Sequence, residues 1–120
     1  MSEAPKVHAW EGIPREVVRP GVVRAGFRGD NSLLVMNWLE PGMEARPHSH
    51  PFDQVACILS GRARFTIGEH VVEVGAGEMI HIPADVVHFG EVVGDEPVVN
   101  LDVFAPVRAD YEHLTAYQER

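Results

Sequence analysis

Basic residues are scarce in this sequence, and they form no cluster along the chain. Ten lysines and arginines stand against 18 aspartates and glutamates, which gives a formal net charge of −8. This balance argues against nucleic acid or an anionic membrane surface as a partner. A small anionic substrate stays compatible with the composition if a metal ion and an arginine supply positive charge locally.

Cysteine and long apolar runs are also nearly absent. The single cysteine, Cys57, excludes an internal disulfide and fits a reducing compartment. No apolar run approaches the roughly 18 residues that a membrane span needs, and residues 1–20 lack the apolar core of a signal peptide. We therefore expect a cytoplasmic protein that does not engage membranes, with its 120 residues forming one domain (1–120).

Short apolar or alternating segments separated by Gly/Pro turns fill most of the chain. They predict strands at residues 17–18, 22–23, 33–39, 54–59, 62–67, 71–74, 79–82, 86–93 and 98–104. Many short strands of this kind indicate an all-β antiparallel sandwich or barrel. Residues 1–12 are interpreted as an N-terminal arm. Residues 110–118 are predicted to form a short helix, because Asp110 suits an N-cap and Tyr111, Leu114 and Tyr117 recur at helical spacing.

Histidines separated by one residue point to a metal site. His48 and His50 would lie on the same face of an extended segment, and Gln54 keeps that parity. With His88 these side chains offer three imidazoles and a carboxamide, a plausible set for a divalent metal. The alternative is a histidine-rich surface loop. His81 competes for the fourth position, whereas the remaining histidines are interpreted as surface residues (His8, His70 and His113).

The spacing of these residues resembles the two motifs of the cupin superfamily. The first motif is matched by Gly42, His48, His50, Gln54 and Gly61, with glutamine where the motif has glutamate. The second motif is matched by Gly77, Pro83 and His88, with Asp85 in a glycine position and Glu91 in an asparagine position. The resemblance implies a double-stranded β-helix, the cupin jelly-roll barrel. It favours His88 over His81, and it implies one divalent ion (Ni, Mn, Fe, Co or Zn) held by His48, His50, Gln54 and His88.

A second constellation lies in the strand predicted at 98–104 and just beyond it. Asn100, Asp102 and Phe104 share one strand face, and Arg108 follows closely. This polar face would by default meet solvent. In a cupin barrel it would instead line the metal-bearing interior. There Asp102 would act as a general acid/base, Phe104 as a platform, and Arg108 as a bidentate clamp for a carboxylate.

Together the two constellations resemble the KdgF-type small cupins. Members of that family convert 4,5-unsaturated monouronates into the linear, ketonised sugar acid. The resemblance implies metal ligands at His48, His50, Gln54 and His88, and catalytic residues at Asp102, Phe104 and Arg108. Two other functions fit the same residues: a metal-dependent dioxygenase of the cupin class, and a cupin that binds a small molecule without turnover.

Apolar residues near the N-terminus predict self-association. Trp10 and the valine pairs at 17–18 and 22–23 would leave apolar surface beside an unpaired sheet edge. A partner subunit commonly covers such an edge, so we expect a homodimer that uses the N-terminal strands.

Overall fold

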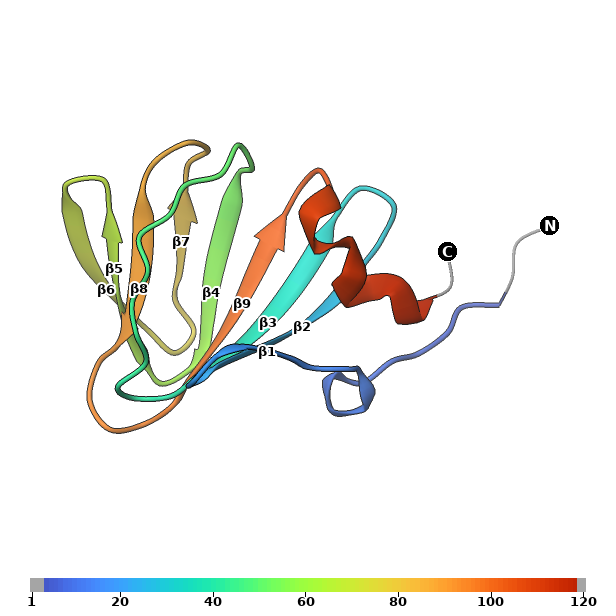
Figure 1. Ribbon diagram of the computed structural model, residues 1–120, viewed down its shortest axis with the longest axis horizontal. Coiled ribbons are helices and arrows are strands. Elements are labelled where there is room, and N and C mark those ends of the chain that lie inside the picture. Colours follow the sequence, from blue (N-terminus) through green and yellow to red (C-terminus); the bar gives the residue numbers. More distant parts are fainter. Residues whose placement is uncertain (1–3, 119–120) are drawn as a thin grey trace.

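Two antiparallel sheets make up the computed structural model, which describes residues 4–118 (Figure 1). The first three residues of the predicted arm lie outside this range. The strands are β1 (Glu16–Arg19), β2 (Val22–Arg28), β3 (Leu33–Leu39), β4 (Gln54–Ser60), β5 (Arg62–Ile67), β6 (His70–Gly75), β7 (Met79–Ile82), β8 (His88–Val92) and β9 (Val98–Phe104). The predicted all-β class is confirmed, and most predicted strand bounds fall within two residues of those found; the exception is β2, which ends at Arg28 rather than at residue 23.

The larger sheet has the order β1-β2-β3-β9-β4-β7, and the smaller sheet has the order β6-β5-β8. The two sheets face each other as the halves of a jelly roll, with their inner faces turned toward a shared interior (Figure 1). Strand β5 shows how the sequence produces this arrangement. Ala63 and Phe65 are buried while Arg62 and Arg64 lie on the opposite face, as the alternation predicts. Pairing of β3 and β4 with β9 joins segments far apart in the chain.

Apolar side chains from both sheets form the main core. This cluster comprises Ala56, Ile58, Ala63, Phe65, Val74, Ile82 and Val98. A second cluster lies under the C-terminal helix and comprises Leu33, Val35, Phe104 and Leu114. Polar side chains are buried as well, namely His50, Gln54, His88, Asn100, Arg108 and Thr115. Because buried polar groups are costly unless they are paired, their concentration here marks a region built for more than packing.

The C-terminal helix, η2 (Ala109–Gln118), is a 3-10 helix. With three residues per turn, the spacing of Tyr111, Leu114 and Tyr117 places all three in one row. Leu114 is buried against β2 at Gly26, where an added Cβ would lie 2.9 Å from the Leu114 Cβ. The predicted helix is therefore present, but Asp110 lies inside its first turn and pairs with Arg108 instead of standing before it as the N-cap.

At the N-terminus, a short 3-10 turn, η1 (Trp10–Gly12), precedes buried Ile13 and strand β1. Strand β1 forms one edge of the larger sheet, and the Val17 side chain on it is exposed. Within residues 4–118, no helix is long and apolar enough to cross a membrane.

Candidate metal centre

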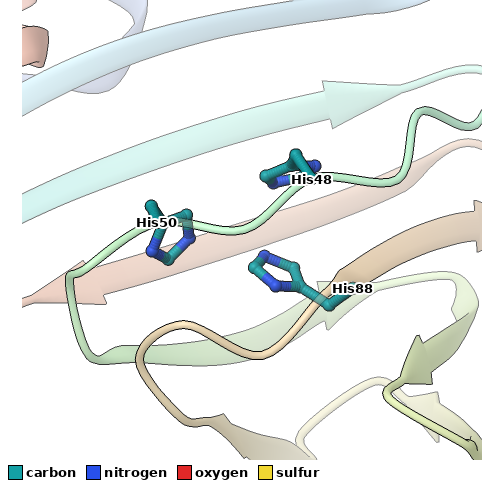
Figure 2. Close-up of side chains that lie close together, drawn as sticks. All are labelled: His48, His50 and His88. Carbon is teal, nitrogen blue, oxygen red and sulfur yellow. The ribbon is translucent and has the colours of Figure 1, made fainter.

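Three histidines from two separate segments come together; His50 and His88 are buried, and His48 is exposed. His48 and His50 lie on the connection between β3 and β4, and His88 begins β8. Backbone hydrogen bonds join the segments, from the His48 nitrogen to the His88 oxygen (3.1 Å) and from the His88 nitrogen to the His48 oxygen (2.8 Å). The His88 ring centroid lies 4.4 Å from that of His48 and 4.9 Å from that of His50. The three rings therefore surround a common space (Figure 2).

Each histidine is oriented by its own backbone neighbourhood. The Nδ1 atoms of His48, His50 and His88 lie 2.8, 2.9 and 2.9 Å from carbonyl oxygens located two residues away in the chain. A carbonyl oxygen only accepts hydrogen bonds, so each Nδ1 must donate. Each neutral ring then carries its lone pair on Nε2. Metal-ligating histidines are commonly held in one tautomer in this way.

The Nε2 atoms lack the partners that a purely structural role would give them. The His88 Nε2 is buried and has no hydrogen-bond partner within residues 4–118. The His50 Nε2 lies 3.0 Å from the Gln54 Oε1, which places two lone pairs face to face. Burial is the main cause that lowers the pKa of both His50 and His88, and this favours their neutral, ligating form. A cation between these atoms would satisfy them all, so the residues fit a metal ion.

Gln54, predicted as the fourth ligand, is oriented by Asp102. Its Nε2 donates to the Asp102 Oδ1 at 2.8 Å, which directs its carbonyl oxygen toward His50. The competing residue, His81, is exposed and pairs with Asp53 outside the cluster. The histidines that come together are therefore those favoured by the motif spacing, within reach of one ion.

The Asp102 carboxylate is the centre of a network of amide donors. Its Oδ1 accepts from Gln54 and from the Asn100 Nδ2 (2.9 Å), and its Oδ2 accepts from the Asn37 Nδ2 (3.0 Å). Burial is the main cause that raises the pKa of Asp102, while the three amide hydrogen bonds oppose that rise. A buried carboxyl group with a raised pKa that lines a cavity beside candidate metal ligands is a candidate for proton transfer.

Sequence reasoning missed Asn37, and it placed Asn100 on the face of Asp102 without giving it a role. Asn37 is the one polar residue in the apolar strand β3, which was an available signal. Its pairing with Asn100 depends on the β3–β9 register, which alternation within one strand does not reveal.

Phe104, predicted as a platform, and Arg108, predicted as a clamp, lie beside the histidine cluster among aromatic rings. Phe104 is 2% exposed and meets the His50 ring edge-on at 5.8 Å, so it packs against a candidate ligand. The Arg108 guanidinium lies within 4.8 Å of the rings of Phe52, Phe104 and Tyr111. Its Nε and Nη2 already form a bidentate pair with Asp110, at 3.1 and 2.6 Å. A clamp role for Arg108 would require Asp110 to be displaced.

Asp85, which replaces a motif glycine, anchors the same region. It adopts a φ of 66°, in the left-handed region that favours glycine, although aspartate is among the better tolerated alternatives. Its backbone nitrogen donates to the His50 oxygen at 2.8 Å. The glycine position is therefore filled without loss of the local turn.

A cavity of about 150 Å³ opens onto the centre. His48, Gln54, His88, Asn100 and Asp102 line it, together with apolar side chains of both sheets. Since sites for drug-sized ligands typically exceed about 300 Å³, this one suits a small metabolite.

Comparison with known proteins identifies the family to which this fold belongs. Residues 38–104 match the cupin domain family. An uncharacterized protein of Streptomyces coelicolor is 32% identical over 80 residues, covering 67% of this chain and 75% of that protein. The H2HPP isomerase of Bacillus subtilis is 26% identical over 82% of this chain, which spans 39% of the isomerase's length. The solved structure of KdgF from Halomonas sp. superposes with a TM-score of 0.79 at 19% identity, covering 89% of this chain and 98% of that one.

Proposed function

Because this chain belongs to the cupin family, we propose that it is a metal-dependent enzyme acting on a small carboxylated sugar. The proposed reaction converts a 4,5-unsaturated monouronate, or a similar sugar or keto acid, to its linear ketonised form. One observation carries the proposal. A carboxylate suited to proton transfer, Asp102, lies in the same cavity as the candidate metal ligands and is hydrogen-bonded to one of them.

The residues that would hold the ion are His48, His50, Gln54 and His88. All four donors are neutral, so a divalent ion would keep its full charge, unlike in a site with a glutamate ligand. When bound, it would supply Lewis-acid polarisation of a substrate oxygen. Glutamine in place of glutamate favours this chemistry over stabilisation of a trivalent, oxidised ion.

Asp102 would move the proton that ketonisation requires. Its Oδ1 accepts two amide hydrogen bonds, whereas Oδ2 accepts one and keeps capacity for a proton. Its raised pKa makes the carboxyl a better proton donor near neutral pH than a free aspartate, which would be almost fully ionised. Proton transfer from oxygen to carbon converts an enol to a ketone without a change in oxidation state. The proposal therefore needs no redox partner.

The comparisons support this proposal at two levels. The structural match to KdgF concerns the fold, because the two chains share only 19% of their residues. The Bacillus subtilis relative is an isomerase, and the proposed conversion is also an isomerisation. The substrate class rests on the sequence pattern shared with KdgF-type cupins around His48 and Asp102.

A direct assay tests the proposal. Metal-loaded protein should accelerate the loss of the double-bond absorbance of 4,5-unsaturated galacturonate above its spontaneous decay. Asp95→Asn, which alters an exposed aspartate remote from the cavity, serves as the control and should match the parent. If the metal-loaded parent produces no acceleration, the uronate assignment is wrong.

A further inference from the structure

The cavity collects positive charge in an acidic protein. Arg19, Arg24 and Arg46 line it, although the whole chain has a net charge of −8. Within residues 4–118, Asp102 is the only carboxylate that lines the same cavity. A concave site with an excess of one charge sign concentrates ligands of the opposite sign. Here the excess is reduced by the ion pairs of Arg24 with Glu16 and of Arg46 with Glu44. The lining still offers guanidinium groups to an anion before any metal charge is added.

All three arginines are paired, Arg19 with the Glu44 backbone oxygen and Arg46 with the Glu44 carboxylate, and Arg24 is held on two sides. Its Nε and Nη2 bind one oxygen of Glu16, at 2.7 and 2.6 Å, and its guanidinium lies 4.4 Å from the centre of the Tyr111 ring. The side chain is 18% exposed. Both contacts with Glu16 use Nε and Nη2, which leaves Nη1 outside the ion pair. A guanidinium that is positioned on two sides and keeps a donor outside its ion pair is prepared for a ligand.

The sheet register places Arg24 next to the proton-transfer network. Arg24 pairs with Asn37 across β2 and β3, and Asn37 pairs with Asn100 across β3 and β9. The three residues thus form one cross-strand row on the face that lines the cavity. Two of them donate to Asp102. An anion on Arg24 would lie beside the proposed acid/base.

Asn100 supplies a second, independent sign of a ligand. It is 5% exposed, and its Oδ1 is buried without a hydrogen-bond partner within residues 4–118. An unpartnered buried acceptor is costly, by about 1–3 kcal/mol. Its Nδ2 is committed to Asp102, so the orientation of the amide is fixed. Because Asn100 lines the cavity, a ligand hydroxyl there is the candidate partner for this buried oxygen.

We infer that Arg24 and Asn100 form the substrate-selecting subsite, in which Arg24 binds the carboxylate and the Asn100 Oδ1 accepts a hydroxyl. Arg19 and Arg46 add to the attractive field at the same cavity. This rests on the proposed function for the substrate class, and it replaces Arg108 as the carboxylate-binding residue. Both arginines pair with a carboxylate through Nε and Nη2, but Arg24 lines the cavity, whereas Arg108 is 6% exposed and does not line it. Arg24 would therefore bind the carboxylate through Nη1.

Two unreactive sugars that differ at one group provide the test. D-galacturonate carries a carboxylate where D-galactose carries a hydroxymethyl group. Their binding to the metal-loaded chain is measured by calorimetry. The parent should prefer galacturonate. Arg24→Gln should weaken galacturonate binding about 10- to 100-fold, the range for one lost charged hydrogen-bond pair, and leave galactose within about twofold.

Two further variants test whether weaker galacturonate binding has a cause other than the lost Arg24 contact. Arg24→Lys keeps the charge facing Glu16 but cannot offer a donor in the fixed planar geometry, so it should restore only part of the preference. Arg62→Gln is the matched control, because Arg62 also faces a glutamate on a neighbouring strand, Glu73, but lies outside the cavity. Its preference should equal the parent's. Metal content and the thermal unfolding midpoint of each variant report whether the site and fold are intact.

Two binding results and one kinetic result would overturn the inference: equal binding of both sugars by the parent, an unchanged preference in the folded Arg24 variants, or turnover with an unchanged KM in Arg24→Gln. The proposed reaction can fail separately. If the parent prefers galacturonate through Arg24 but does not accelerate loss of the unsaturated uronate, the subsite stands and the reaction does not. If turnover occurs with an unchanged KM in Arg24→Gln, the reaction stands and the subsite does not.

Discussion

Replacing Asp102 by asparagine separates proton transfer from structure, because the surroundings of this residue can absorb the change. The new amide oxygen can take the position of Oδ1 and keep the hydrogen bonds from Gln54 and Asn100. The new NH2 group would face the Asn37 Nδ2, and that single hydrogen bond is lost. Asn37 keeps two backbone acceptors, the Val35 and Asn100 oxygens, at 3.2 and 3.3 Å.

We therefore expect Asp102→Asn to lower the stability of the fold modestly and the catalytic rate strongly. A hydrogen bond to a charged acceptor contributes about 1.5–3 kcal/mol, and removal of a buried charge offsets part of that loss. Gln54 keeps its orientation, so metal content should be unchanged. Loss of a general acid/base lowers the rate by about 10²–10⁴-fold, equivalent to about 3–5 kcal/mol of activation free energy.

The assay follows kcat and KM for 4,5-unsaturated galacturonate, with metal content and unfolding measured on the same samples. We expect kcat of Asp102→Asn to fall by the stated factor while KM and metal content stay near the parent values. A near-normal kcat would refute the assignment of Asp102 as proton donor. A variant that loses its metal would show instead that Asp102 serves mainly to orient Gln54.

The other predictions concern the ligand set, the packing and the assembly. Gln54→Glu should hold the metal more tightly, because an anionic ligand adds attraction, yet turn over more slowly; faster turnover would contradict the role given to the neutral amide. Gly26→Ala should lower the free energy of unfolding by about 1–3 kcal/mol, because the added Cβ overpacks against the C-terminal helix. Gly12→Ala is the control: an added Cβ there meets nothing within 4 Å, so thermal unfolding should show a far smaller loss of stability. The chain should be a homodimer through edge strand β1, where Val17 is 71% and Val18 is 37% exposed; a monomer in light scattering at high micromolar concentration would exclude this.

Much of the fold was predictable because its signals are local. Alternation in residues 62–67 and the Gly/Pro turns located the strands within a few residues. The spacing from His48 to Gln54 and on to His88 identified the candidate ligands. This motif spacing is tied to a fold that brings the two segments side by side. Even the spacing of Tyr111, Leu114 and Tyr117 fits the 3-10 helix that forms.

The interactions that tune the site were not predictable, because they depend on register between distant strands. Asn37 and Asn100 are 63 residues apart yet lie opposite each other. Arg24 is added to the same row by the pairing of β2 with β3. The pair of Arg108 with Asp110 depends on the first turn of a helix whose type the sequence left open. Strand parity gives the face of a residue but not its neighbours.

The central claim, that His48, His50 and His88 hold a metal ion, is tested most directly by elemental analysis of purified, metal-loaded protein. We predict about one divalent ion per parent chain. His88→Ala should lose it, because this variant removes the buried Nε2 that has no partner within residues 4–118. His81→Ala, which removes an exposed histidine outside the cluster, should retain it. Full occupancy in the His88 variant, or an empty parent, would contradict the account.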